Sequence, residues 1–330
     1  MHELINPAPI TAALRPGWDR QRRFQDTLVL KESWTFELDG TLTPVIRPLC
    51  EADAYHDEAL LSSLSACCET APYKQGAELY LFGTAHPPRQ DTTAMSVSIT
   101  LASAHQKTWK KRLAVLGESH WHGGLFGHRR SPLKPLSPLP LRYEYAYGGT
   151  CVESDRRLLA NPAGCGFNPD RGRLRDNRVP QIDWPDSPMT RPRQNTTPAG
   201  FAPLASFWEP RFQASGTFEN DQLPEDGCPI ALNARADLHN AAPLDQRFEQ
   251  PFCGGEILTL QGFFADHAEA VALTLPALKP CVRDARGNQL NMTCDTLVID
   301  CDNRELSRLH RVGLSQQRLK PQRHTLTVSL

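Results

Sequence analysis

The distribution of proline constrains the folds open to this chain more than any other feature. Its 330 residues include 28 prolines and 21 glycines, and 14 of the prolines lie between Pro132 and Pro224. Proline lacks a backbone donor and breaks helix interiors and central strands, so a long helical bundle is disfavoured. The same stretch is rich in large aromatic residues, which a disordered linker lacks. We therefore expect a long irregular segment that aromatic anchors hold against a folded body.

Strand-like patterns flank this segment on both sides. Apolar residues alternate in the first third, and β-rich runs return in the last third, with the clearest ranges being Thr27–Leu38, Ala94–Leu101, Trp109–Leu116, Asp295–Asp300 and Arg304–Leu314. Asp39-Gly40 predicts a hairpin turn, and Pro44 assigns the returning strand to a sheet edge. The predicted fold is mainly β, with antiparallel, sandwich-like sheets, a long Pro/Gly-rich irregular middle segment and few short helices.

One stretch outside the middle segment has helical spacing. The range Asp53–Cys67 places Ala54, Leu60, Leu61 and Leu64 near one helical face, which predicts a short helix. The changes in composition divide the chain into a β-rich region at 1–131, the Pro/aromatic-rich segment at 132–230 and a second β-rich region at 231–330. We expect the three to form one integrated structural unit.

Composition excludes several classes of partner. The 36 Lys+Arg and 37 Asp+Glu leave a net charge of -1, so no bulk attraction favours a nucleic acid. No window approaches the roughly 18 uncharged apolar residues that a membrane helix needs, and the amino terminus lacks the apolar stretch of an export signal. We therefore expect no membrane contact and a cytoplasmic location in which the 10 cysteines are reduced thiols.

No set of residues predicts a catalytic or metal centre. Gly117-Glu118-Ser119-His120-Trp121 is similar to a nucleophile elbow, but Trp121 stands where the sharp turn requires a second glycine. His120 and His122, with His128 further on, could bind a metal, although no Cys or carboxylate has ligand spacing. The basic stretch Lys107–Arg112 predicts the solvated side of an edge strand. We predict no catalytic residues, no metal and no cofactor.

Several strings, in collinear order over nearly the whole chain, resemble a bacterial domain-of-unknown-function family of effector adaptors, or chaperones, for type VI secretion. Members of that family are encoded beside VgrG-type spike and PAAR-repeat proteins. The strings are LVLKESWTFELDG (Leu28–Gly40), APYKQGAELYLFGTAHPP (Ala71–Pro88), KRLAVLGESHW (Lys111–Trp121), LPLRYEYAYGG (Leu139–Gly149), NPAGCGF (Asn161–Phe167), PAGFAPLASFWEPR (Pro198–Arg211) and NAAPLDQRFEQPFCGGEILTLQGF (Asn240–Phe263).

The resemblance implies a non-enzymatic protein that binds a toxin effector, a PAAR/VgrG spike protein, or both. Aromatic side chains are favoured anchors in protein interfaces, so the candidate contacts are Tyr143, Tyr145, Tyr147, Trp184 and Trp208. The competing interpretation is that these rings only pin the irregular segment to the core. Two other functions stay open: a hydrolase or metal-dependent enzyme that uses the Ser119/His120/His122 region, and a structural protein associated with the spike.

Overall fold

The structure is a computed structural model that describes residues 2–103, 107–124, 127–218, 227–265, 267–277, 280–315 and 324–329. Strands dominate these residues, and the predicted mainly β fold with mostly antiparallel sheets is confirmed. The described part contains no α-helix; its short 3-10 turns are η1 (Tyr143–Tyr145), η2 (Val152–Ser154), η3 (Phe212–Ser215) and η5 (Leu244–Gln246). None of its helical elements is long and apolar enough to cross a membrane.

The largest sheet has seven strands in the order β19-β7-β24-β25-β3-β2, with β4 paired to β3. All its pairs are antiparallel except β7 with β24. The predicted hairpin at Gly40 joins β3 to β4. Gly40 has a positive φ of 91°, a backbone conformation that glycine adopts more readily than other residues. The strands are β2 (Thr11–Trp18), β3 (Phe24–Phe36), β4 (Leu42–Val45), β7 (Ala77–Phe82), β19 (Arg247–Phe248), β24 (Thr293–Asp300) and β25 (Glu305–Ser315).

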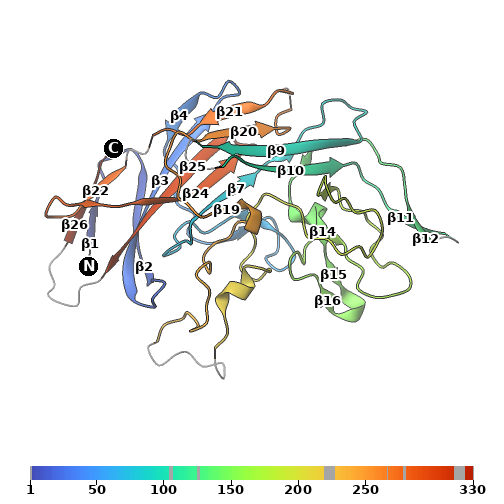
Figure 1. Ribbon diagram of the computed structural model, residues 1–330, viewed down its shortest axis with the longest axis horizontal. Helices are drawn as coiled ribbons and strands as arrows, with labels where there is room; N and C mark the ends of the chain where they lie inside the picture. Colours follow the sequence, from blue (N-terminus) through green and yellow to red (C-terminus); the bar gives the residue numbers. More distant parts are fainter. Residues whose placement is uncertain are drawn as a thin grey trace.

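A second sheet packs on one face of the first (Figure 1). Its order is β18-β10-β9-β20-β21. Alternate residues of β7, such as Leu79 and Leu81, and of β9, such as Val97 and Ile99, are fully buried in the shared core. Burial of each such side chain stabilises the fold by about 1.5–3 kcal/mol. The strands are β9 (Ala94–Ala102), β10 (Trp109–Leu116), β18 (Ile182–Asp183), β20 (Ile257–Gln261) and β21 (Val271–Thr274).

A third sheet brings the two ends of the chain together. Its order is β1-β26-β22-β23, and β1 runs parallel to β26 (Figure 1). Leu28 and Leu30 of β3 pack against Val282 and Val328 of this sheet. Trp34 belongs instead to the core shared with the second sheet, so a single face of β3 serves two cores. The strands are β1 (His2–Ile5), β22 (Cys281–Arg283), β23 (Gln289–Leu290) and β26 (His324–Ser329).

A buried charged cluster lies on β3 and β25 between these two cores. Glu32 accepts hydrogen bonds from Arg308 and contacts His310 Nε2 at 2.7 Å. Arg308 also donates to the carbonyls of Pro276 (2.5 Å) and Ala277 (3.0 Å), where the chain leaves the second sheet for the third. Burial alone would raise the pKa of Glu32, but the bonds from His310 and Arg308 outweigh it and lower that pKa. The buried Glu32–Arg308 pair and the bonds of Arg308 to two carbonyls therefore fix the crossing between the two sheets.

The middle segment is irregular, as predicted, and lies beside β10 of the second sheet, to which its strand β18 pairs (Figure 1). Phe201, Trp208 and Tyr143 are almost fully buried and anchor it to the large core. That core draws residues from all three regions of the sequence. The remaining short strands are β8 (Thr84–Ala85), β11 (Trp121–Gly124), β12 (Gly127–Arg130), β13 (Leu139–Pro140), β14 (Tyr147–Gly148), β15 (Thr150–Cys151), β16 (Arg156–Arg157) and β17 (Cys165–Gly166).

The predicted helix at Asp53–Cys67 is wrong. The range forms β5 (Ala54–Tyr55) and β6 (Leu64–Ala66), which pair antiparallel around a turn. Leu60 and Leu61, expected on a buried face, are 65% and 66% exposed. Asp53 instead accepts the Cys68 backbone N–H and pairs with Arg211 of the middle segment. These long-range bonds outweigh a helical preference carried by only four apolar residues.

Candidate partner-binding pocket

An apolar pocket opens between the middle segment, β10 and the loop that precedes β19. Its volume is about 330 Å³. Aromatic, proline and leucine side chains form most of the wall, together with one lysine and two carboxylates. The lining residues are Lys111, Tyr143, Ala160, Trp184, Thr197, Pro198, Leu204, Glu209, Pro210, Pro243, Leu244 and Asp245. A concave, mainly apolar site with a few polar groups is the usual form of a ligand or peptide pocket.

The loop before β19 is attached to β7 by buried hydrogen bonds. Glu78 Oε2 accepts the backbone N–H groups of Ala241 at 2.9 Å and of Ala242 at 3.1 Å. Gln246 Nε2 donates to Leu79 O at 2.7 Å. The chain is thus bonded to β7 just before η5 and at its last residue, Gln246. These bonds fix the position of Leu244 and Asp245, which line the pocket.

A buried ion pair supports the same loop from below. The side chains of Lys74 and Glu78 form an ion pair in which they are 1% and 0% exposed. The Tyr80 hydroxyl donates a hydrogen bond to the Glu78 carboxylate. Burial raises the pKa of Glu78, but Lys74, Tyr80 and the loop N–H groups outweigh it, so the net effect is a lowered pKa. Removing one partner from such a pair would leave an uncompensated buried charge, so the pair fixes the loop in place.

Lys111 forms the polar part of the pocket wall. Its Nζ donates to Asp245 Oδ1 at 2.9 Å and to Gln246 Oε1 at 2.7 Å. It also lies 5.2 Å from the centroid of the Trp184 ring and 5.6 Å from that of Phe201, both cation–π distances. Burial lowers the pKa of Lys111 to about 8, although Asp245 acts in the opposite direction. The lysine thus links β10, the loop and the middle segment.

The prediction of a solvated edge at Lys107–Arg112 is correct for Lys110 and Arg112, which are exposed, and wrong for Lys111, which is 4% exposed. β9 pairs with the whole of β10, whereas β18 pairs only with Ala114 and Val115, so Lys110 and Arg112 have a paired strand on one side only among the described residues. Lys111 has the same parity as the buried Leu113, so the strand alternation places it on the inner face. That parity was the available sequence signal for a buried lysine.

The mouth of the pocket combines exposed leucine with negative charge. Leu244 lines the pocket yet is 59% exposed, and Leu159, next to the lining residue Ala160, is also exposed. Asp245 is already paired with Lys111. Glu209 is bound by the neutral amide of Gln213, so its charge has no cationic partner among the described ion pairs. An apolar group with an adjacent positive charge would match this mouth.

The sequence profile of a bacterial family, described as "Uncharacterized protein conserved in bacteria (DUF2169)", matches residues 21–311. The chain belongs to this family. Every residue that lines the apolar pocket falls within the matched range. No curated protein and no solved structure matches the chain.

The five aromatic residues predicted as partner contacts lie at different places in this DUF2169 protein. Tyr143 and Trp184 line the apolar pocket, and Trp208 packs edge-on against Tyr143 with 5.6 Å between ring centroids. Trp184 is partly exposed, whereas Tyr143 and Trp208 are buried in the core. Tyr145 lines a different pocket, and Tyr147 belongs to a separate small core cluster. Contact between these residues and a partner stays a prediction.

Leu244 and Asp245 of this DUF2169 protein were not predicted as site residues. They lie in the 3-10 turn η5, which is too short for a periodic pattern. Their role depends on Lys111 and Trp184, which are far away in the sequence and close in space.

The Ser119 region of this DUF2169 protein forms a separate pocket of about 270 Å³. Ser119 is buried, and its Oγ accepts a hydrogen bond from Arg130 Nε at 2.8 Å. His120 Nε2 lies 3.7 Å from Glu118 Oε1, and within the described ranges no hydrogen bond joins Ser119 to a histidine. His122 is exposed on the β11–β12 hairpin. The described part of the chain holds no group of three or more His, Cys, Asp or Glu side chains suited to a metal.

Proposed function

We propose that this protein is a non-enzymatic adaptor, or chaperone, that binds a type VI secretion effector in the cytoplasm and helps to load it onto the VgrG/PAAR spike. The observation that carries the proposal is the apolar pocket with Leu244 exposed at its mouth. An exposed apolar surface with a polar rim suits reversible protein binding, because apolar burial supplies affinity and the rim limits nonspecific association. The choice of partner rests on the strings that resemble secretion adaptors.

Five of those strings contribute to the pocket or to its support, and one of them, Leu139–Gly149, supplies the lining residue Tyr143. Ala71–Pro88 supplies the ion pair beneath the loop, and Lys111–Trp121 supplies the buried lysine. Pro198–Arg211 and Asn240–Phe263 supply further lining residues. The part of the sequence that carries the resemblance therefore includes most of the residues that line the proposed binding site.

The pocket accepts an apolar side chain of the effector that is followed or preceded by a basic residue. The wall offers Trp184, Leu204 and Pro243 to the apolar group. The carboxylates of Glu209 and Asp245 stand at the mouth, where a partly exposed charge pair adds specificity more than affinity. Truncating a well-packed anchor in such a pocket costs about 2 kcal/mol or more, which is roughly a thirtyfold loss of affinity.

The test is a gene deletion in the native host, complemented with variants of the full chain. Deletion should reduce the amount and secretion of an effector linked to a PAAR or VgrG protein. Leu244→Asp places a charge in the pocket mouth, so it should fail to restore secretion and should weaken effector capture at least tenfold. Leu61→Asp is the matched control, because that leucine is also exposed but lines no wall of this pocket.

The variants also separate the adaptor from an enzyme. Both leucine variants should keep the parent's melting temperature, since both side chains are largely exposed. His120→Ala should restore secretion fully. If every PAAR- or VgrG-linked effector is secreted normally without this protein, or if His120→Ala alone abolishes capture, the adaptor proposal is wrong.

A further inference from the structure

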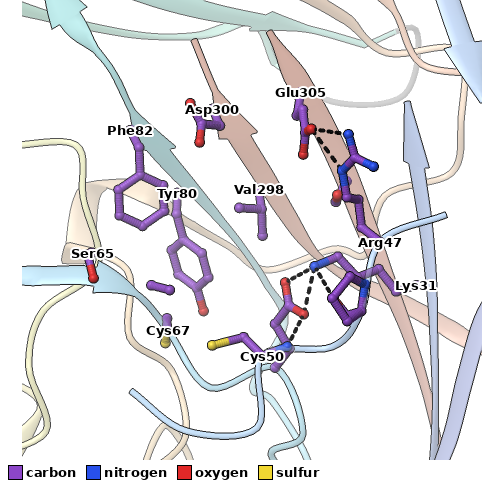
Figure 2. Close-up of a pocket in the computed structure, with 14 residues that line it drawn as sticks. Lys31, Arg47, Cys50, Ser65, Cys67, Tyr80, Phe82, Val298, Asp300 and Glu305 are labelled. Carbon is purple, nitrogen blue, oxygen red and sulfur yellow. Dashed lines mark hydrogen bonds and ion pairs between the residues drawn. The ribbon is translucent and has the colours of Figure 1, made fainter. Parts of the chain in front are cut away.

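A third pocket lies on the face of the seven-stranded sheet that points away from the second sheet, beneath the segment that contains β5 and β6 (Figure 2). Its volume is about 260 Å³. Strand residues of β3, β7, β24 and β25 form its floor, and the segment from 47 to 69 forms the opposite wall. The lining residues are Lys31, Arg47, Pro48, Cys50, Ser65, Ala66, Cys67, Glu69, Tyr80, Phe82, Val298, Asp300, Glu305 and Ser307.

The inner end of this pocket is electrically neutral. Lys31 Nζ donates to both oxygens of Glu69, at 2.7 and 2.8 Å, and to Pro48 O at 3.1 Å. Glu69 Oε2 also accepts the Cys50 backbone N–H at 2.8 Å. Both charged side chains are largely buried, and their bonding capacity is directed at each other. An incoming anion would have to displace the Glu69 carboxylate to reach the lysine.

The outer end carries an excess of negative charge. Arg47 and Glu305 pair there with partly exposed side chains, and both hydrogen bonds between them end on Glu305 Oε1. Asp300 accepts hydrogen bonds from the backbone N–H and the side-chain amide of Asn303, at 2.9 and 2.8 Å, both from neutral groups. The ion pairs of the described residues include none to Asp300. The pocket therefore contains three carboxylates against two cations.

An apolar wall leads to this charge. Phe82 lies directly opposite Asp300 in the β7–β24 register, and Val298 is one pair further along the same face. Figure 2 shows the rings of Phe82 and Tyr80 on one side of the space, Arg47 and Glu305 on the other, and Asp300 at one end. Aromatic faces attract cations as well as apolar stems. A guest with an alkyl chain and one terminal positive charge matches both features.

We propose that this pocket binds the side chain of a lysine from a partner protein, with the alkyl stem against Phe82 and Val298 and the ammonium group between Asp300 and Glu305. The ammonium group restores charge balance without breaking either existing ion pair. Lysine suits the site because its stem tolerates an apolar wall while its compact head keeps three donors for carboxylates. This site is separate from the apolar pocket lined by Trp184 and Leu244, and its occupancy does not depend on the proposed adaptor function.

The test measures binding of N-acetyl-lysine methylamide to the full chain by NMR titration, with the norleucine analogue as the uncharged control. The lysine probe should bind saturably in the millimolar range, and the norleucine probe should bind at least fivefold more weakly. Asp300→Asn should weaken lysine binding about fivefold. Asp186→Asn, an exposed carboxylate outside the pocket, should leave binding unchanged.

Glu305→Gln provides a second variant, so the proposal stays testable if Asp300→Asn unfolds. It should also weaken the lysine probe, because it removes charge from the same end of the pocket. Equal affinity for the two probes, no saturable binding of lysine, or unchanged binding in both folded variants would overturn the proposal. Tighter binding of free putrescine than of the lysine probe would overturn the assignment to a protein side chain.

Discussion

Lys111 should impose a pH dependence on stability that a Lys111→Met variant lacks. Folding lowers the pKa of this lysine from 10.5 to about 8, because burial disfavours the ammonium form. Between these two values the unfolded chain retains a proton that the folded chain has released. The free energy of unfolding therefore rises as the pH increases through this window, and the penalty is fully present below about pH 8.

The magnitude follows from the two pKa values. Lowering the pKa from 10.5 to about 8 corresponds to about 3 kcal/mol over the whole window. About 2 kcal/mol of this change falls between roughly pH 7.5 and pH 10. Methionine keeps an unbranched side chain one atom shorter than lysine, and it lacks the ammonium group that faces the Trp184 ring. It removes the ammonium partner of Asp245, a carboxylate that is 47% exposed to solvent.

Urea unfolding followed by tryptophan fluorescence at those two pH values measures the effect. The parent should gain about 2 kcal/mol more than Lys111→Met on going to the higher pH. Titrations shared by both proteins cancel in this difference. Lys110→Met is the matched control, because its side chain is exposed on the other face of β10. An equal rise in the parent and in Lys111→Met, or loss of the rise in Lys110→Met, would refute the reasoning.

Two further substitutions test how the pocket and its surroundings are supported. Glu78→Gln should lower the free energy of unfolding by about 3–5 kcal/mol in urea titrations, because it leaves the buried Lys74 without its carboxylate. Glu51→Gln, in an exposed pair, should leave the free energy of unfolding unchanged within error. Similar losses of stability in the two variants would contradict the buried-pair argument. Gly117→Ala should cost at least about 1–3 kcal/mol, since its Cβ would lie 1.8 Å from a backbone carbonyl. Gly123→Ala, with nothing within 4 Å, should melt like the parent, and equal melting of both would contradict the predicted clash.

Most of the strand pattern and the irregular character of the middle segment could be predicted from the sequence. Strand residues alternate between two faces, so the buried parity of β3 and β10 follows from period two alone. The turn at Gly40 has a local signature, because few residue types adopt a positive φ. Each of these features depends on interactions within a few residues of the chain.

The candidate site is different, because its parts meet only in the folded chain. Lys111 has the parity of a buried residue, yet its partners Asp245 and Gln246 lie in a short turn with no periodic pattern. The range Asp53–Cys67 has a helical spacing that long-range bonds to Arg211 override. The conformational preference of a short segment depends on neighbouring residues, so it does not reflect a partner that is more than a hundred residues away in the sequence.

The sequence alone determined which faces of the strands are apolar and where the chain turns, since backbone geometry and side-chain period act locally. Only the tertiary structure decided what covers each face. On β3, Leu28 packs against the third sheet while Trp34 packs against the second. The hydrophobic effect is non-directional, so an apolar face of a strand predicts that some element will cover it but does not predict which one. The pairing of buried charges and the closure of both pockets depend on that choice.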